Sequence, residues 1–211
     1  MTKLWDAIRR RRVLAIGIGV LVVAGLASGV VVGRAILTPE EPAKAANSSA
    51  NSPMNAKPDD FTAFRSEPAG FELAYPTSWS KLNTKDPQIL LLVSQGTQDS
   101  LLVRSLELQA PVGPQQLQAA KQLTDQIVTA NKTAQMVTEP KQIELGGLPG
   151  FFYFYSFEDT PSGQQGVHSH YFLFNGKTMI SLVFQSLPKE HFSTSAPTFD
   201  KITATFRALK K

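Results

Sequence analysis

The sequence contains no cysteine among its 211 residues. Disulfide bonds, thiolate metal sites, a catalytic thiol and a lipid-modified cysteine anchor are therefore all excluded. Histidine is scarce as well, with three residues in the whole chain. A domain of this composition has to be stabilised by its apolar core, to which the 42% of apolar residues can contribute.

Charged residues are missing from one long run near the N-terminus. Residues 13–33 carry none, and at about 1.5 Å per residue they form a helix of ~31 Å, close to a hydrocarbon core of ~30 Å. Residues 9–12 are all arginine, and such basic flanks stay in the cytoplasm. We therefore predict a cytoplasmic N-terminus (1–12) and an uncleaved transmembrane signal-anchor (13–37). We expect the rest of the chain to lie on the extracytoplasmic side of the membrane, which we predict to be a bacterial cell membrane.

Two other export signals match parts of this region. Ala43-Lys44-Ala45 resembles a small-residue cleavage site, but the apolar run is longer than the ~7–15 residues of a signal-peptide core. The arginines followed by Val13 and Leu14 resemble a twin-arginine signal, a match that four consecutive arginines produce by chance. Cleavage of the N-terminal segment stays open as the alternative to anchoring.

Three glycines, Gly25, Gly29 and Gly33, are spaced by four within the predicted anchor and so lie on one face of that helix. Small residues at this spacing let two helix backbones approach closely, which favours a homodimer through the membrane helix. Glycine is also common in membrane helices in general, and this second explanation stays open.

The basic character of the chain is concentrated in its N-terminal segment. Six of the 21 basic residues lie at or before Arg34, and the rest of the chain carries 15 basic against 16 acidic residues. A near-neutral domain lacks the basic face of a nucleic-acid-binding protein. Residues 38–60 have no apolar period and no aromatic residue, which predicts a flexible linker with an average span of ~25 Å. The extracytoplasmic domain is therefore expected over residues 61–211.

Short apolar runs and turn residues alternate through this domain, which predicts a chain of strands. Helices are expected from Pro114 to Asn131 and from about Pro197. A two-residue hairpin turn is expected at Asn175-Gly176. The predicted strands are residues 61–66, 71–75, 89–94, 101–108, 142–145, 150–158, 167–175 and 178–185.

The late strands are apolar on both faces. An antiparallel sheet with one face in water would show a polar set, so both faces are expected to be covered by the two helices. The predicted fold class is α+β, a three-layer α/β/α sandwich around a mainly antiparallel sheet, preceded by one transmembrane helix. One face is expected to carry Tyr171, Leu173, Ile180, Leu182 and Phe184, and the other Phe172, Phe174, Met179 and Val183.

Two short motifs add a family resemblance. Tyr75-Pro76-x-x-Trp79 closes the first hairpin, and Gly146-Gly147-Leu148-Pro149-Gly150 precedes the late strands. With the order of elements and a closing helix that carries Phe199 and Phe206, they resemble the PsbP-like fold over about residues 61–209. That fold is seen in the extrinsic PsbP subunit of photosystem II, in a Ran-binding nuclear import factor, and in many small bacterial lipoproteins and membrane-anchored proteins. The resemblance implies a binding or assembly factor rather than an enzyme.

Two candidate sites stand out within the domain. His168 and His170 are two residues apart on a predicted strand and so point to one face. If the preceding hairpin centres near Gly163, Glu158 lies opposite His168, and the three side chains are candidate ligands for a divalent metal. The alternative is a polar strand end with an ordinary cross-strand pair. Tyr75 and Trp79 form either an exposed aromatic contact patch or a plug at the end of a sheet.

No catalytic set is evident, and no cofactor is predicted. There is no Gly-x-Ser-x-Gly elbow. The glycine-rich turn at residues 146–150 is not a phosphate loop, because no Lys-Ser/Thr follows it. The adjacent acids Glu158 and Asp159 face opposite sides of a strand. We therefore expect a membrane-tethered, non-enzymatic binding or assembly module that recognises another membrane or envelope protein. The alternatives are a carrier of a small apolar ligand or lipid, with a pocket between sheet and helix, and a metal-dependent activity at His168 and His170.

Overall fold

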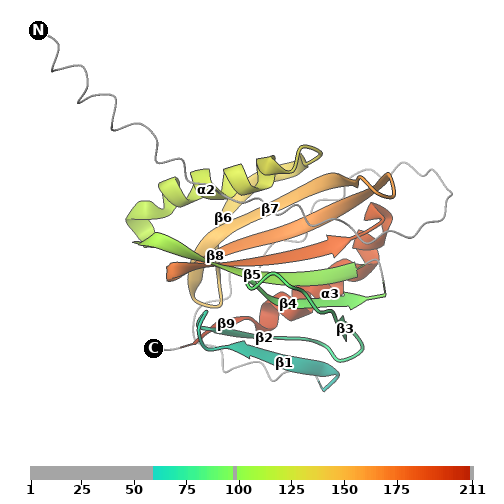
Figure 1. Ribbon diagram of the computed structural model, residues 1–211, viewed down its shortest axis with the longest axis horizontal. Coiled ribbons are helices and arrows are strands. Elements are labelled where there is room, and N and C mark those ends of the chain that lie inside the picture. The colour runs from blue at the N-terminus through green and yellow to red at the C-terminus, as the bar shows by residue number, and fades with distance from the viewer. Residues whose placement is uncertain (1–58, 97–98, 210–211) are drawn as a thin grey trace, which may run out of the picture.

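A computed structural model describes residues 59–96 and 99–209, which form two antiparallel sheets and two α-helices (Figure 1). This part of the chain contains no helix long and apolar enough to cross a membrane. The predicted anchor, with Gly25, Gly29 and Gly33, and nearly all of the predicted linker lie outside the described residues.

The smaller sheet has the strand order β1-β2-β9. Its first two strands, β1 (Phe61–Ser66) and β2 (Phe71–Pro76), form the predicted hairpin. Gly70 closes the turn with φ +72°, a conformation that glycine adopts without strain. The third strand, β9 (Arg207–Ala208), pairs with β2. It was not predicted, because two residues carry no periodic signal.

The larger sheet has the order β3-β4-β5-β8-β7-β6, and all neighbouring strands are antiparallel. Its edge strand β6 starts seven residues earlier than predicted. The first half of this strand is polar and largely exposed, so it has no apolar period that would predict a strand. Pro140 is tolerated there, since an edge strand needs no outward N–H donor. The strands are β3 (Ser80–Lys81), β4 (Ile89–Gln95), β5 (Asp99–Val112), β6 (Gln135–Leu145), β7 (Leu148–Asp159) and β8 (Gln164–Ser186).

Strand β8 doubles back on itself in its middle (Figure 1). Nε2 of His168 lies 3.0 Å from Oε1 of Gln185, although 17 residues of straight strand would separate them by about 56 Å. The reversal falls at Asn175-Gly176, where Gly176 has φ +61°. These contacts confirm the predicted hairpin. We call residues 164–175 the first arm, which pairs with β7, and residues 176–186 the second arm, which pairs with β5.

One face of the large sheet packs against helix α2 (Leu117–Ala130), which follows a short 3-10 turn, η1 (Pro114–Gln116). The predicted helix from Pro114 is thereby confirmed. Leu117, Ala120 and Val128 of α2 share a core cluster with apolar side chains of β7 and β8. These partners are Phe151, Tyr153, Tyr155, Phe172, Phe174 and Met179.

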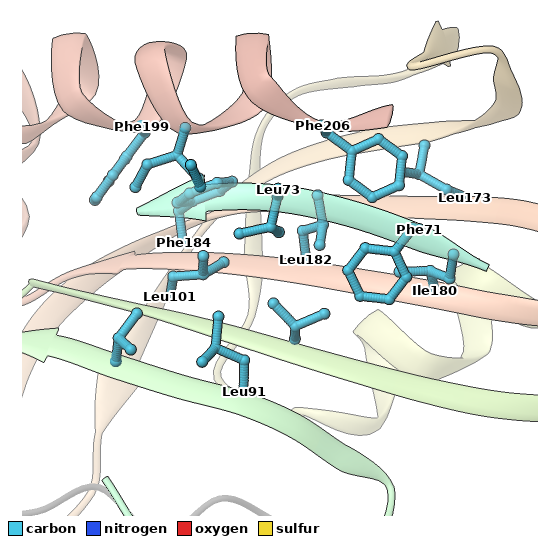
Figure 2. Packing of buried hydrophobic residues seen from close by; sticks show 14 of the residues in the cluster. Phe71, Leu73, Leu91, Leu101, Leu173, Ile180, Leu182, Phe184, Phe199 and Phe206 are labelled. Carbon is cyan, nitrogen blue, oxygen red and sulfur yellow. The ribbon is translucent and has the colours of Figure 1, made fainter. Parts of the chain in front are cut away.

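The opposite face packs against helix α3 (Phe192–Thr205) and the small sheet. Figure 2 shows Phe199 beside Phe184, with ring centroids 4.9 Å apart, and Phe206 beside Phe71, at 5.4 Å. The expected α+β class with mainly antiparallel strands and two helices is confirmed. The second sheet, which shares a layer with α3, is an addition to the expected architecture.

Helix α3 begins five residues before the expected start near Pro197, directly after a second 3-10 turn, η2 (Lys189–His191). Proline has a helical φ, so it removes one backbone hydrogen bond here without ending the helix. The predicted apolar stripe is correct for Phe199 and Ile202, which are buried. Phe206 and Leu209 follow the helix rather than belonging to it.

Candidate functional site on the two faces of β7 and β8

The two histidines of the first arm lie on the face that α2 packs against. Across the ladder to β7, Tyr155 lies opposite His168 and Tyr153 opposite His170. The two histidines share a face, as expected. Glu158 lies opposite Gln165 instead of His168, so the predicted register was wrong.

The cause of the register error is the turn that joins β7 to β8. The carboxylate of Asp159 accepts hydrogen bonds from the backbone N–H of Ser162, at 3.2 Å, and from its hydroxyl. The backbone carbonyl of Asp159 also accepts from the N–H groups of Ser162 and Gly163. These bonds fix the reversal around residues 161–162, and Asp159 pairs with Gln164. The centre therefore lies earlier than Gly163, and Glu158 is carried away from the histidines.

A hydrogen-bonded chain of five side chains runs through the histidine pair. The hydroxyl of Tyr155 lies 3.1 Å from Nδ1 of His168 and 3.2 Å from Nδ1 of His170. The outer ring nitrogens also have partners: Nε2 of His168 meets Gln185, and Nε2 of His170 meets the hydroxyl of Ser181. We call Ser181, His170, Tyr155, His168 and Gln185 the histidine chain.

The partners assign a direction to every proton in the histidine chain. Oε1 of Gln185 accepts, so His168 carries its proton on Nε2, and its Nδ1 accepts from the Tyr155 hydroxyl. The oxygen of Tyr155 then accepts from Nδ1–H of His170, whose Nε2 accepts from Ser181. Each ring nitrogen is used once, and both rings are neutral.

Burial favours the same neutral state. It lowers the pKa of His168 to about 4, against a hydrogen bond to Gln185 that acts in the other direction. The pKa of His170 lies well below its usual value, first because of burial and then because of the nearby His168 and Arg104. An imidazole that stays neutral near pH 7 is consistent with the hydrogen-bond assignment.

The three candidate metal ligands, His168, His170 and Glu158, are not brought together. All four ring nitrogens already have hydrogen-bond partners, and Glu158 is exposed on another part of the strand. Among the described residues, no group of three or more His, Cys, Asp or Glu side chains is placed to hold a metal ion. The alternative interpretation, a cross-strand polar cluster, fits the geometry.

Ser181 and His170 make the hydrogen bond of a nucleophile–base pair. Each is only 6% exposed, so a substrate has no access to either. The third partner is the neutral hydroxyl of Tyr155 rather than a carboxylate. The pair therefore has a structural role in this arrangement.

The other face of β7 carries aromatic side chains that are only partly covered. Phe152 lies opposite Tyr171, with ring centroids 4.8 Å apart. Phe154 lies 4.8 Å from Phe192, the first residue of α3. All four are half-buried, and we call Phe152, Phe154, Tyr171 and Phe192 the aromatic surface.

The position of α3 explains why this surface is left open. The helix packs over β2 and the second arm of β8, where Phe199 and Ile202 enter the core. Its ring contact with β7 is made by Phe192, which meets Phe154. Beyond β7, strand β6 places Thr138 opposite Phe154 and Lys141 opposite Phe152.

Strand β6 also presents two exposed apolar side chains, Met136 (43%) and Val137 (50%). Met136 lies opposite Tyr155 and therefore on the α2 face of the sheet, not on the face of the aromatic surface. A shift of register falls between Met136 and Thr138, so Val137 is the extra residue of a bulge. Bulges on an edge strand disrupt the ladder and hinder unspecific pairing with another sheet.

The remaining predicted contact residues belong to the core. Trp79 is 5% exposed and packs edge-on against Phe199, with centroids 6.3 Å apart. Tyr75 is half-buried against the same cluster. The plug interpretation holds for Trp79, and an exposed contact patch at this residue is wrong because its ring completes the core under α3.

Comparison with solved structures identifies the fold. The solution structure of cyanobacterial PsbP (CyanoP) from Synechocystis sp. PCC 6803 has a TM-score of 0.53 and 14% identity, over 75% of this chain and 98% of that chain. The chain has a PsbP-like fold. The resemblance expected from the two motifs is confirmed.

Two further structures show the same PsbP-like arrangement. LpqN, described as involved in cell envelope biogenesis of Mycobacterium tuberculosis, has a TM-score of 0.50 and 12% identity over 72% of this chain and 87% of its own. A protein from Bacteroides thetaiotaomicron has a TM-score of 0.51 and 17% identity over 72% of this chain and 50% of its own. No protein-family model matches the sequence, and comparison with curated proteins finds no match.

Proposed function

We propose that the chain is a non-enzymatic binding or assembly module that recognises another envelope protein through the aromatic surface. Proteins of the same fold support this assignment at a general level, among them LpqN with its described involvement in cell envelope biogenesis. The identities are 17% or less, so the argument rests on the surface itself.

The aromatic surface is the observation that carries the proposal. Four aromatic rings touch one another in pairs on the α3 side of the sheet, each half-buried. Tyr171 and Phe192 also contact the buried rings of Phe184 and Phe199, which fixes the position of the surface on the core. Aromatic side chains and Met are enriched at the centres of protein–protein interfaces, where a few such residues supply most of the binding energy. Exposed Val137, the bulge residue of the neighbouring strand, adds an apolar side chain at the sheet edge.

The carrier hypothesis has less support from the packing. The rings expected to line its pocket pack against one another instead: Tyr153 on Phe172 at 5.5 Å and Phe151 on Phe174 at 6.3 Å. The same rings form one cluster with the buried side of α2. The space between this helix and the sheet is therefore occupied by the protein's own side chains.

The predicted signal-anchor gives the proposal its setting. An anchor at residues 13–37 and a linker of ~25 Å would hold the domain near the outer face of the membrane. The partner expected there is a membrane or envelope protein, and the linker would let the domain search the surrounding surface.

Capture of the partner from membranes tests the proposal. The full-length chain is crosslinked in cells, purified and analysed by mass spectrometry beside a Phe152→Ser, Phe154→Ser double variant and a Gln122→Ala control on the exposed side of α2. The proposal predicts one dominant protein with the wild type and the control, strongly reduced with the double variant. Equal recovery with all three chains would contradict it.

A further inference from the structure

The histidine chain ties together three neighbouring strand segments. Tyr155 belongs to β7, the two histidines to the first arm of β8, and Ser181 and Gln185 to the second arm. We propose that the histidine chain is an acid-sensitive latch: protonation of the histidine pair releases β7 from the two arms of β8 and loosens this part of the large sheet.

The hydrogen-bond pattern leaves no place for an added proton on both rings. One added proton is accommodated: His168 donates from Nδ1 to Tyr155, Tyr155 donates to Nδ1 of His170, and His170 donates from Nε2 to the rotated hydroxyl of Ser181. With both rings protonated, both Nδ1–H groups point at the oxygen of Tyr155, and its own proton loses its acceptor inside the protein, because the residue is 5% exposed. A buried polar group without a partner is strongly destabilising.

The charge itself is a second obstacle, and His170 shows it most clearly. The Ser181 hydroxyl can rotate to accept from a protonated Nε2, so the hydrogen bond itself survives. The charge, however, would sit at a site that is 6% exposed and that has no carboxylate among its hydrogen-bond partners. An unpaired buried charge costs more than it gains from one neutral hydrogen bond.

The charged and titratable groups around the pair do not supply a counterion. On β5, Arg104 lies opposite Ser181 and is paired with Asp86 of the loop between β3 and β4. On β7, Tyr153 donates to Asp125 of α2, whose carboxylate also binds Lys121. Both nearby carboxylates thus have cationic partners, and Arg104 repels a positive charge on His170.

The degree to which acid favours opening follows from the difference in the pKa of His168 between the closed and the open latch. A histidine with a pKa of about 4 when closed and an ordinary pKa of about 6.5 when open favours opening about 30-fold at pH 5. The first arm and β7 also carry the aromatic surface on their other face. Opening of the latch would therefore weaken partner binding in acid. This consequence rests on the proposed function; the latch itself is independent of it.

Hydrogen exchange of the full-length chain tests the latch directly. Exchange of the β7 amides is measured by mass spectrometry at pH 7.5 and pH 5, with correction for the intrinsic pH dependence of exchange. We expect protection of β7 to fall at least tenfold at pH 5 in the wild type. A His191→Gln control, which changes the third histidine on η2, should behave in the same way.

A His168→Gln, His170→Gln double variant removes the titrating groups and should show protection of β7 that no longer depends on pH. Unchanged protection in the wild type at pH 5, or the same acid-induced loss in the double variant, would overturn the proposal. If the double variant does not fold, NMR titration of the wild-type rings decides. Rings still neutral at pH 6 support the latch, and rings that are half-protonated above pH 6 refute it.

Discussion

Replacing Tyr155 with phenylalanine removes one oxygen atom from the centre of the histidine chain. The change leaves Nδ1–H of His170 without an acceptor and Nδ1 of His168 without a donor. Each buried group that loses its partner costs about 1–3 kcal/mol, and the easier burial of a phenyl ring offsets part of this. We expect the free energy of unfolding to fall by about 2–4 kcal/mol at pH 7.5.

Tyr153→Phe is the matched comparison, two residues away on the same face of β7. Its hydroxyl lies 2.7 Å from both Asp125 and Thr124. After the substitution Asp125 keeps Lys121 and contact with water, and Thr124 keeps the carbonyl of Lys121. The expected loss is therefore smaller, about 1 kcal/mol.

Urea unfolding of the full-length chain measures both variants, followed by the fluorescence of buried Trp79 in a Trp5→Phe background. The account requires a clearly larger loss for Tyr155→Phe than for Tyr153→Phe. Equal losses, or a loss below about 1 kcal/mol for Tyr155→Phe, would refute the argument that the Tyr155 hydroxyl bridges two neutral histidines.

Three further predictions follow from the same structure. A Cβ at Gly150 would lie 2.0 Å from the backbone oxygen of Phe172, so Gly150→Ala should cost at least about 3 kcal/mol of unfolding free energy in the same urea titration. Gly113→Ala is the control: its Cβ meets only the flexible end of Gln116, and the loss should be less than about 1 kcal/mol. The free energy of unfolding should fall on acidification, because the lowered pKa of His168 means that the unfolded chain binds more protons than the folded chain between pH ~6.5 and ~4. Unfolding titrations should show a loss of about 2 kcal/mol at pH 5 from His168 alone. Asp99 and Asp200, whose pKa values are raised by burial, partly oppose this loss at lower pH. Phe152→Ser with Phe154→Ser should strongly reduce partner capture while lowering the unfolding free energy by about 2–4 kcal/mol, since both rings are only partly buried. Complete unfolding of this variant in the urea titration would show that the rings belong to the core.

The sequence was most informative where turn chemistry and strand parity agreed. Asn175-Gly176 predicted the reversal in β8, and the apolar sets on its two faces correspond, apart from the half-buried Val183, to the two core clusters. It was least informative where residues are polar and exposed, as in the first half of β6, or where a local hydrogen bond decides, as with Asp159 and the β7–β8 turn. Helix α3 begins before its predicted start because Pro197, a residue typical of the first helical turn, lies inside this helix.

The candidate site was predictable in part. The spacing of His168 and His170 correctly placed both on one face, but Tyr155 as their common partner depends on a register that the sequence does not specify. The aromatic surface was missed because aromatic residues at both parities suggested two covered faces. A helix of 14 residues is only about 21 Å long and 10 Å wide, too small to cover one face of a six-stranded sheet.

Site-specific photocrosslinking in intact membranes tests the central claim, that the aromatic surface binds a partner protein. A photoreactive residue is placed at Phe152 or Phe154 of the full-length chain, or at exposed Gln122 on α2 as the control. The account predicts a crosslink to the same protein from both aromatic positions and none from Gln122. No crosslink at either aromatic position, or equal crosslinking from Gln122, would contradict it.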